Sequence, residues 1–224
     1  MHNQNIGFLW DLDGTIIDSF NLHYESWKAA LLTENIELSH LKFFESFGQN
    51  NRISLTNYLG FEPDENLYKK ITELKEKHFR LEVADKARPF PGVLNWLSVF
   101  KEMGIKQAIA SSAPMVNIEA IMNSFDLHPF FDAVIAGANL PSKPCPDIFI
   151  HAANALRCQP KECVVFEDST AGLSAGKAAK MTTVGLATTQ LKDTISADFI
   201  LENFNTPPVE FLKSIQNFLS SSIK

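Results

Sequence analysis

The residues best suited to chemistry in this sequence are two acidic pairs, the first near its start. Asp11 and Asp13 are separated by one residue and follow the apolar run 6–10, with Gly14 and Thr15 next. In an extended chain both carboxylates face the same side, and they repel each other unless a cation or a shared proton separates them. Gly14 permits a tight turn, and Thr15 adds a hydroxyl. The pattern predicts a metal or proton-transfer site, with an ordinary polar strand end as the alternative.

The second acidic pair is Glu167 and Asp168, which follow the apolar run 163–166 and precede the segment 169–172. Carboxylate oxygens, a backbone carbonyl and water suit a hard cation such as Mg²⁺. Acidic residues at this place could instead cap the N-terminus of a helix. A joint cation site with the first pair requires both strand ends to meet above one edge of a sheet.

Groups that could bind phosphate occur at two further places. Ser111 and Ser112 follow the run 107–110, and hydroxyls and amides at a strand-to-helix turn can hold phosphate oxygens. Lys143 lies in the segment 141–147, which contains three prolines. A lysine held in such a loop can present a compact cation to a phosphate. Taken singly, the serines are better explained as a helix cap, and Lys143 is better explained as a solvated surface lysine.

Short apolar runs are predicted to be the strands that position these residues. They are 6–10, 107–110, 133–136, 163–166, 182–186 and 199–201. Helical stripes lie between them, which indicates an α/β fold with a Rossmann-like parallel sheet core and helices on both faces. Ligands bind at the carboxyl ends of the strands in such sheets, and all four motifs follow strands. Together they supply the parts that phosphoryl transfer requires.

Residues 20–86 interrupt this alternation, because no strand-like run occurs there. The two longest apolar stripes are Phe20, Tyr24, Trp27 and Leu31, and then Leu67, Ile71, Leu74, His78 and Leu81. Shorter helices are expected at 41–47 and 53–59. We predict a catalytic core of residues 1–19 and 87–224 and an all-helical cap of residues 20–86, inserted after the first strand. A helical block at that place is well suited to act as a lid.

Composition excludes several classes of protein. The 224 residues carry a net charge of −6, whereas a nucleic-acid grip needs a basic face. Three cysteines cannot form a disulfide framework. Residues 1–5 show neither a basic segment nor an apolar run, so no signal peptide is expected, and no apolar stretch is long enough to span a membrane. We expect a cytoplasmic protein that binds neither nucleic acid nor membrane, and a monomer at this size.

These motifs resemble those of the haloacid dehalogenase superfamily. In chain order they are DLDGT at 11–15, SS at 111–112, KP at 143–144 and EDS at 167–169. The similarity is closer to the branch that contains small sugar-phosphate phosphatases and β-phosphoglucomutase. It covers nearly the whole chain and is strong over 6–20 and 88–187, while the cap matches more loosely.

The resemblance implies a role for each catalytic residue. Asp11 corresponds to the nucleophile that forms an aspartyl-phosphate. Asp13 corresponds to the acid/base that protonates the leaving oxygen and then activates the acceptor. Lys143 corresponds to the lysine that neutralises the nucleophile and the phosphate.

It also implies the ligands of the metal and of the substrate. Mg²⁺ is expected as the cofactor, held by Asp11, the backbone carbonyl of Asp13 and Asp168, with Glu167 as ligand or neighbour. Ser111 corresponds to the phosphate-binding hydroxyl, and we expect Ser112 and Thr15 to help to bind the substrate.

The cap residues bear on the choice between two activities. His23 and Lys77 are similar to positions that the mutase uses near its substrate. The arginine with which the mutase grips a distal phosphate falls at Asn51, with Arg52 one residue later. We expect Arg52 to reach the substrate, but the neutral Asn51 weakens the mutase interpretation.

The sequence therefore favours a Mg²⁺-dependent phosphatase acting on a small phosphorylated metabolite, a phosphomonoester such as a sugar phosphate. β-Phosphoglucomutase, an isomerase that uses the same aspartates, is the first alternative. A dehalogenase needs neither a second carboxylate nor a metal, so Asp13 and Asp168 speak against it. A non-catalytic binding module would be expected to have lost at least one of the motif residues.

Overall fold

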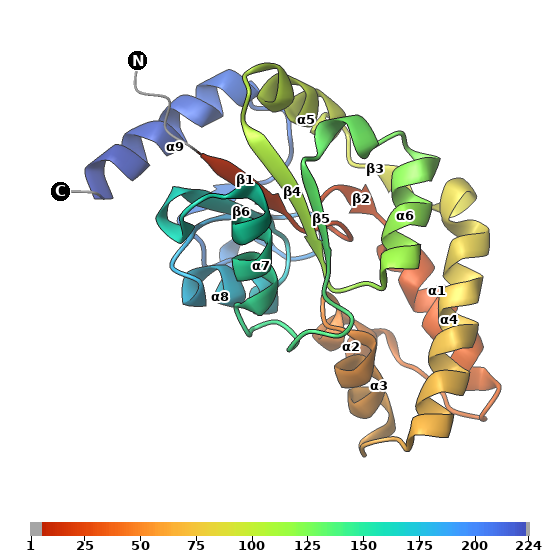
Figure 1. The fold of residues 1–224 in the computed structure, drawn as a ribbon. Coiled ribbons are helices and arrows are strands. Elements are labelled where there is room, and N and C mark those ends of the chain that lie inside the picture. The colour runs from red at the N-terminus through yellow and green to blue at the C-terminus, as the bar shows by residue number, and fades with distance from the viewer. Residues whose placement is uncertain (1–5, 223–224) are drawn as a thin grey trace.

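The computed structural model describes residues 6–222 and has a parallel sheet at its centre (Figure 1). Its six strands lie in the order β5-β4-β1-β6-β7-β8. Their bounds are β1 (Gly7–Trp10), β4 (Lys106–Ser111), β5 (Ala133–Ala136), β6 (Cys163–Glu167), β7 (Thr182–Leu186) and β8 (Phe199–Leu201). Each coincides with one of the predicted runs. Residues 1–5, on which the expectation of no signal peptide rests, lie outside the described part of the chain.

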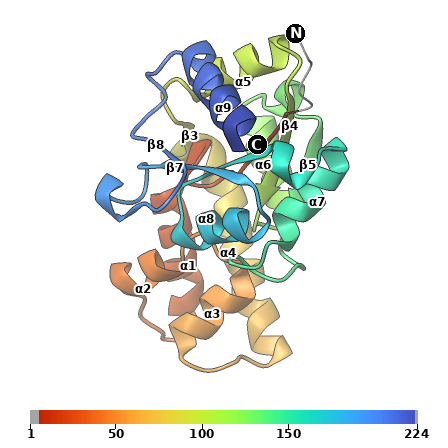
Figure 2. The same cartoon turned by 90° about the vertical axis from the view of Figure 1, so that its left-hand side faces the viewer.

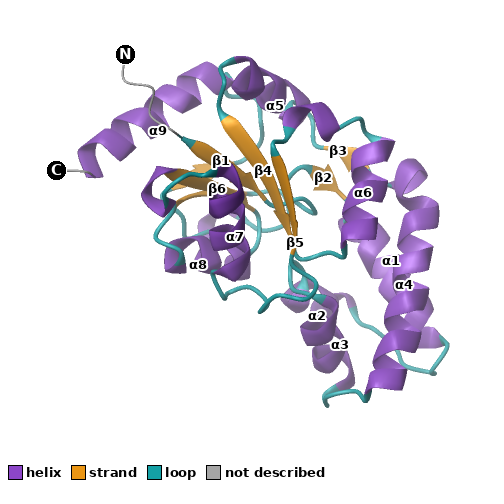
Figure 3. Cartoon of the chain, in the orientation of Figure 1, coloured by secondary structure: helices purple, strands orange, loops and turns teal. Residues whose placement is uncertain are grey.

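Helices cover both faces of the sheet, as Figures 2 and 3 show, and the predicted fold class is confirmed. On one face lie α5 (Val93–Glu102), α6 (Met115–Ser124) and α9 (Pro208–Ser222), and on the other lie α7 (Asp147–Leu156) and α8 (Thr170–Ala178). Short 3₁₀ turns occur at His128–Phe130, Pro160–Glu162 and Lys192–Thr194. Between residues 6 and 222, none of the helices is both long and apolar enough to cross a membrane.

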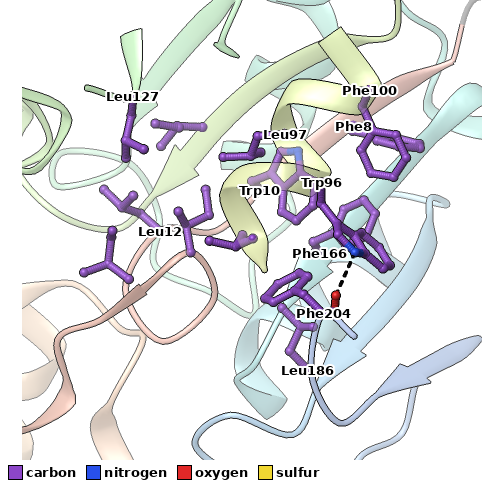
Figure 4. Close-up of a cluster of buried hydrophobic side chains, with 14 of the residues drawn as sticks. Phe8, Trp10, Leu12, Trp96, Leu97, Phe100, Leu127, Phe166, Leu186 and Phe204 are labelled. Atoms are coloured by element: carbon purple, nitrogen blue, oxygen red, sulfur yellow. Dashed lines mark hydrogen bonds between the residues drawn. The ribbon is translucent and has the colours of Figure 1, made fainter. Parts of the chain in front are cut away.

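Aromatic side chains fill the space between the sheet and α5 (Figure 4). Trp10 of β1 stacks on Phe166 of β6, with ring centroids 3.9 Å apart. Trp96 of α5 packs in the same cluster, and its indole N–H donates to the carbonyl of Phe204 at 3.1 Å. A buried indole needs such a partner. This packing fixes the strands whose ends carry the acidic motifs.

The cap consists of α1 (Phe20–Leu32), α2 (His40–Ser46), α3 (Asn51–Leu59) and α4 (Glu65–Lys86). Two short antiparallel strands, β2 (Ile17–Asp18) and β3 (Arg88–Pro89), join it to the core. Figure 1 shows α1 and α4 side by side, with α2 and α3 near the carboxyl ends of β4 and β5. The cap therefore lies over the edge of the sheet where the motifs end.

The buried face of α4 differs from the predicted stripe. Leu81 was expected inside, but its side chain is 70% exposed. The buried stripe instead contains Ile71, Lys75, Phe79 and Val83. These residues recur every four positions and share one helix face. The apolar residues alone indicated a different face of α4, because one of the inward positions is occupied by Lys75.

Candidate active site

Three charged side chains meet at the carboxyl ends of β1 and β6. Asp11 directly follows β1, and its backbone N–H donates to the Phe166 carbonyl at 2.9 Å, which continues the pairing of the two strands. The Lys143 Nζ lies 2.5 Å from Asp11 Oδ1 and 2.6 Å from Glu167 Oε1. Lys143 is only 2% exposed. The loop after β5 thus inserts an ammonium group between two carboxylates from neighbouring strands.

The electrostatics of this cluster favour a cation. Burial raises the pKa of Asp11 well above its ordinary value; the Lys143 ammonium opposes the shift, and Glu167 and Asp168 add to it. Burial and then the charge of Glu167 raise the pKa of Asp168 to about 7, against hydrogen bonds from threonines. Burial disfavours the charged form of Lys143, but Asp11 and Glu167 raise its pKa overall. Three buried carboxylates share one buried ammonium, so negative charge remains in excess.

Asp168 is held by hydroxyl groups from two directions. Thr15 donates to its Oδ1 at 2.9 Å, and Thr189, in the loop after β7, donates to its Oδ2 at 2.5 Å. The Gln190 side chain donates to its backbone carbonyl. Gly14 has a φ of +86°, and a Cβ there would overlap the Asp168 carboxylate. Thr15, which was expected to help to bind the substrate, is fully buried and donates its hydroxyl hydrogen to Asp168.

Glu167 is fixed equally firmly. It accepts hydrogen bonds from the backbone N–H of Ser169 at 2.7 Å and from the Ser169 hydroxyl at 2.9 Å, in addition to Lys143. A Cβ at Gly172 would overlap its carboxylate. The N-terminus of α8 is capped by Ser169, whose Oγ accepts from the Gly172 N–H. Because Ser169 is the cap, Glu167 is left to face the site.

The donor set fits a magnesium ion held partly by substrate. Within residues 6–222, no three His, Cys, Asp or Glu side chains converge into a protein-only metal site. Mg²⁺ is usually bound by one or two carboxylates together with waters and substrate phosphate. Asp11 and Asp168, with the excess negative charge around them, meet that requirement. Asp13 and Glu167 lie on the same strand ends.

Asp13 sits at the boundary between the core and the cap. Its Oδ1 accepts from the Ser19 hydroxyl at 2.7 Å and lies 3.0 Å from Nε2 of His23 on α1. The His23 nitrogen is at ion-pair distance but is not aligned for a hydrogen bond. Burial alone would raise the pKa of Asp13, but His23 and the Ser19 hydroxyl lower it overall. The cap thus helps to set the charge on Asp13.

A pocket opens next to these residues, between the core and the cap. Its core side carries Asp11, Asp13 and Ser111, and its cap side carries His23 and Lys75. Ser111 is almost fully buried and accepts from the Ala113 N–H at 3.2 Å. This turn leads into α6 and leaves Ser111 on the lining of the pocket.

The loop between α2 and α3 closes one side of the pocket. The Ser112 hydroxyl donates to the Gly48 carbonyl at 2.8 Å, and the Asn50 N–H donates to Ser142 Oγ at 3.1 Å. Ser112 lines the pocket, but its hydroxyl is already used to hold the cap.

Two cap residues that the sequence assigned to the substrate, Lys77 and Arg52, do not line the pocket in this structure. Lys77 is exposed, and Lys75 lines the pocket in its place. Two positions along an α-helix differ in direction by about 200°, so only one of these lysines can face inward. Arg52 does not reach the pocket either: its guanidinium lies 3.7 Å from the centre of the Tyr68 ring and 2.7 Å from Glu65.

The structure also places at the site residues that no sequence motif indicated. They are Lys75 and Glu76 on α4, Gln49 in the closing loop, and Thr189 and Gln190 after β7. A signal for Lys75 was present, because it continues the spacing of Ile71, Phe79 and Val83. Glu76 follows Lys75 on the same helix, and Gln49, Thr189 and Gln190 lie in loops, where no periodic pattern marks a residue as inward-facing.

Comparisons with known proteins identify a family and several relatives of this chain. Residues 7–180 match the model of a haloacid dehalogenase-like hydrolase family. Hexitol phosphatase B of Escherichia coli is 27% identical, over 81% of this chain and 83% of its own. The β-phosphoglucomutase of Bacillus subtilis is 29% identical, over 91% and 92%. The chain is 30% identical to SUPPRESSOR OF QUENCHING 1, chloroplastic, of Arabidopsis thaliana over 81% of its length, and spans 18% of that protein.

The fold has a counterpart among solved structures. The β-phosphoglucomutase of Clostridium difficile superposes with a TM-score of 0.85 over 97% of this chain and 98% of its own, at 23% identity. At that identity the match speaks for the architecture alone. The family model covers most of the chain, and the predicted motifs lie within it. The chain therefore belongs to the haloacid dehalogenase-like hydrolases.

Proposed function

We propose that this chain is a Mg²⁺-dependent phosphatase that hydrolyses a small phosphomonoester, a sugar phosphate, through an aspartyl-phosphate. The observation that carries the proposal is the contact of Lys143 with both Asp11 and Glu167 beside a pocket lined by Asp13. The relatives named as phosphatases support the reaction class. Residues 20–86 form the cap in this proposal, and residues 1–19 and 87–224 form the core.

In the first step an Asp11 carboxylate oxygen attacks phosphorus, and the bond to the leaving alcohol breaks. A carboxylate is a weak nucleophile, so its target must be neutralised. Lys143 lies beside Asp11 and offers charge-assisted hydrogen bonds to it and to the developing negative charge. Ser111 and its neighbouring amides, at the turn into α6, bind the phosphate oxygens.

Asp13 gives the leaving alcohol its proton. In the free enzyme His23 lowers the pKa of Asp13, which favours the carboxylate. A bound phosphate brings negative charge next to Asp13, and a like charge raises the pKa of a carboxyl group. In the second step Asp13 takes a proton from water, which attacks phosphorus, releases phosphate and restores Asp11.

Mg²⁺ would be held by Asp11, the Asp13 carbonyl and Asp168, with Glu167 adjacent, and would supply charge stabilisation to the transferring phosphoryl group. The protein prepares this place by fixing Asp168 with Thr15 and Thr189.

Phosphomutase activity is the second candidate, and one relative at 29% identity supports it. The same aspartates would return the phosphoryl group to another hydroxyl of the substrate. A mutase must hold a second phosphate while its intermediate turns over. Arg52 is directed toward Glu62 and Glu65 instead, which favours hydrolysis.

The test is a phosphate-release assay with Mg²⁺ over a panel of sugar phosphates, with β-glucose 1-phosphate included. A coupled assay follows glucose 6-phosphate in parallel. Phosphatase activity predicts free phosphate that disappears with a chelator and returns with added Mg²⁺. Formation of glucose 6-phosphate from β-glucose 1-phosphate without net phosphate release would establish the mutase instead.

A further inference from the structure

Apart from His23 and Lys75, the cap half of the pocket is built from aromatic rings and uncharged polar groups. Its aromatic members are Trp27, Phe43, Phe47 and Tyr58. Its neutral polar members are Ser46, Gln49, Asn51 and Ser54. Among the described residues that line the whole pocket, the ionisable side chains other than Tyr58 are Asp11, Asp13, His23 and Lys75. Lys75 is thus the one lysine or arginine among them, and its own partners decide whether it can bind an anion.

The charge of Lys75 is balanced within the cap. Its Nζ lies 2.7 Å from Glu76 Oε1, and both side chains are buried. Burial would raise the pKa of Glu76, but Lys75 and a hydrogen bond from Asn51 lower it overall, so Glu76 stays ionised. The Lys75 ammonium also lies 5.3 Å from the centre of the Trp27 ring and 5.6 Å from the centre of the Phe79 ring. The pair therefore adds no net positive charge to the pocket.

Other side chains hold the Glu76 carboxylate in place beside Lys75. The Asn51 side chain donates to Glu76 Oε1 at 2.7 Å, and Asn117 of α6 donates to Oε2. Asn117 in turn accepts from Arg80 at 2.8 Å. The Asn51 amide group is committed to Glu76 as well. The network thus fixes both the lysine and the nearest neutral polar residue.

Arg52 is held on the outer side of the cap. It contacts Glu65 at 2.7 Å and Glu62 at 3.3 Å, and it stacks on the Tyr68 ring. Arg52 is therefore not available to the pocket, and no other arginine of residues 6–222 lines it.

Two buried polar atoms at the pocket lack a hydrogen-bond partner among the described residues: Nε2 of His23, which lies 3.0 Å from Asp13, and the side-chain oxygen of Gln49. The side-chain oxygen of Gln49 is buried and accepts no hydrogen bond from the described residues. A buried acceptor without a donor is costly. A substrate hydroxyl would supply that donor, whereas an anionic oxygen would be repelled by it.

We propose that the pocket selects a monophosphate whose remaining part is an uncharged polyhydroxyl group, and discriminates against a second phosphate or a carboxylate on the same molecule. This inference rests on the proposed phosphatase activity and narrows its substrate class. Aromatic faces and neutral hydrogen-bonding groups match sugar carbons and hydroxyls. A second anion would lose its hydration without gaining a free cation.

The test compares matched compounds in the Mg²⁺-dependent phosphate-release assay. Fructose 6-phosphate is paired with fructose 1,6-bisphosphate, and glucose 6-phosphate with 6-phosphogluconate, which carries a carboxylate at the other end. We expect kcat/KM to be at least about tenfold lower for the more anionic member of each pair. p-Nitrophenyl phosphate serves as a probe of the phosphatase chemistry alone.

A variant tests the residues that carry the inference. Glu76→Gln removes the charge that balances Lys75, and it should move the kcat/KM ratio about tenfold toward the more anionic member. Glu73→Gln is the control, because Glu73 is exposed on the same helix. Thermal unfolding establishes whether each variant is folded. If Glu76→Gln is not folded, the comparison of the paired compounds with the wild-type protein decides the inference.

The outcomes separate the two proposals. Release of phosphate with equal or higher kcat/KM for the more anionic compounds would overturn the inference and leave the phosphatase standing. An unchanged ratio in a folded Glu76→Gln protein would overturn the role of the Lys75–Glu76 pair. Absence of phosphate release from every compound, p-nitrophenyl phosphate included, would overturn the phosphatase and the inference with it.

Discussion

Nε2 of His23, on the first helix of the cap, lies 3.0 Å from Oδ1 of Asp13 at the end of the core strand β1. The imidazole is nearly fully buried and stacks on Phe79 of α4, with ring centroids 4.3 Å apart. Two cap helices therefore fix the position of a group that contacts the proposed acid/base. The proposed proton transfer by Asp13 would then depend on where the cap lies.

Replacing His23 tests this dependence. We expect His23→Gln to lower kcat by about 10- to 100-fold with a smaller change in KM, since one positioned proton-transfer group contributes about 10²- to 10⁴-fold. The measurement is steady-state kinetics on the best substrate. His151→Gln, an exposed histidine on α7, is the matched control. Equal kcat in the two variants would remove His23 from the mechanism.

The nucleophile has a direct test. Asp11→Asn should reduce turnover by at least about a thousandfold, because an amide cannot form the acyl phosphate on which the mechanism depends. Phosphate release is the readout, and circular dichroism with thermal unfolding checks the fold. Asp18→Asn, at an exposed aspartate of β2, should keep wild-type activity. Appreciable turnover by a purified Asp11→Asn protein would sink the aspartyl-phosphate mechanism.

The contact between Thr189 and Asp168 predicts an effect on metal binding. Thr189→Val removes a hydroxyl that donates to the carboxylate at 2.5 Å while keeping the branched shape. Groups that orient a metal ligand contribute about 10- to 100-fold to affinity. We expect Mg²⁺ affinity, measured by calorimetry and by Mg²⁺-dependent thermal stabilisation, to fall by about tenfold. Thr194→Val, at an exposed threonine, should bind Mg²⁺ like the wild type; equal affinities would refute this role of Thr189.

The buried Lys75–Glu76 pair predicts a pH-dependent loss of stability. Glu76→Gln leaves the Lys75 charge buried without its partner, which costs about 3 kcal/mol in the free energy of unfolding at pH 7. The pKa of Glu76 is lower in the folded state than its ordinary 4.5. Its contribution is therefore fully present above that value and is lost as the pH falls through the folded-state pKa.

Urea denaturation at pH 7 and at pH values below 4.5 measures this difference. The gap in unfolding free energy between the wild type and Glu76→Gln should shrink toward acid, while Glu73→Gln should match the wild type at both pH values. A gap that stays constant with pH would mean that the loss comes from packing rather than from charge.

Much of the fold could be predicted because it repeats simple patterns. Buried parallel strands are short continuous apolar runs, and the run 199–201 was recognisable although it forms an edge strand. The two-residue strands β2 and β3 were not foreseen, because so few residues carry no period. Helix α9 was also missed, although Phe211, Leu212, Ile215 and Leu219 form a buried stripe.

The candidate site, too, was predictable from the sequence only in part. The core motifs follow strands, so the sheet brings Asp11, Ser111, Glu167 and Asp168 to one edge once the strand order is known. Lys143 reaches that edge from a longer loop. Which cap residues face inward depends on the rotation of each helix about its axis. Lys77, which was expected at the site, is exposed, whereas Lys75, two positions earlier, is buried.

The two connections between the cap and the core are paired with each other. Ile17 lies opposite Pro89 and Asp18 opposite Arg88, and the Phe90 N–H donates to the Ile16 carbonyl at 2.9 Å. Two separate connections would leave the cap free to slide and twist relative to the core. Connections that are hydrogen-bonded to each other instead act as a single hinge. Any movement of the cap relative to the core would therefore be limited mainly to rotation about this ribbon. Such a rotation would return His23 to the same place beside Asp13, so the alignment of the cap with the core would depend on the four paired backbone positions of the ribbon.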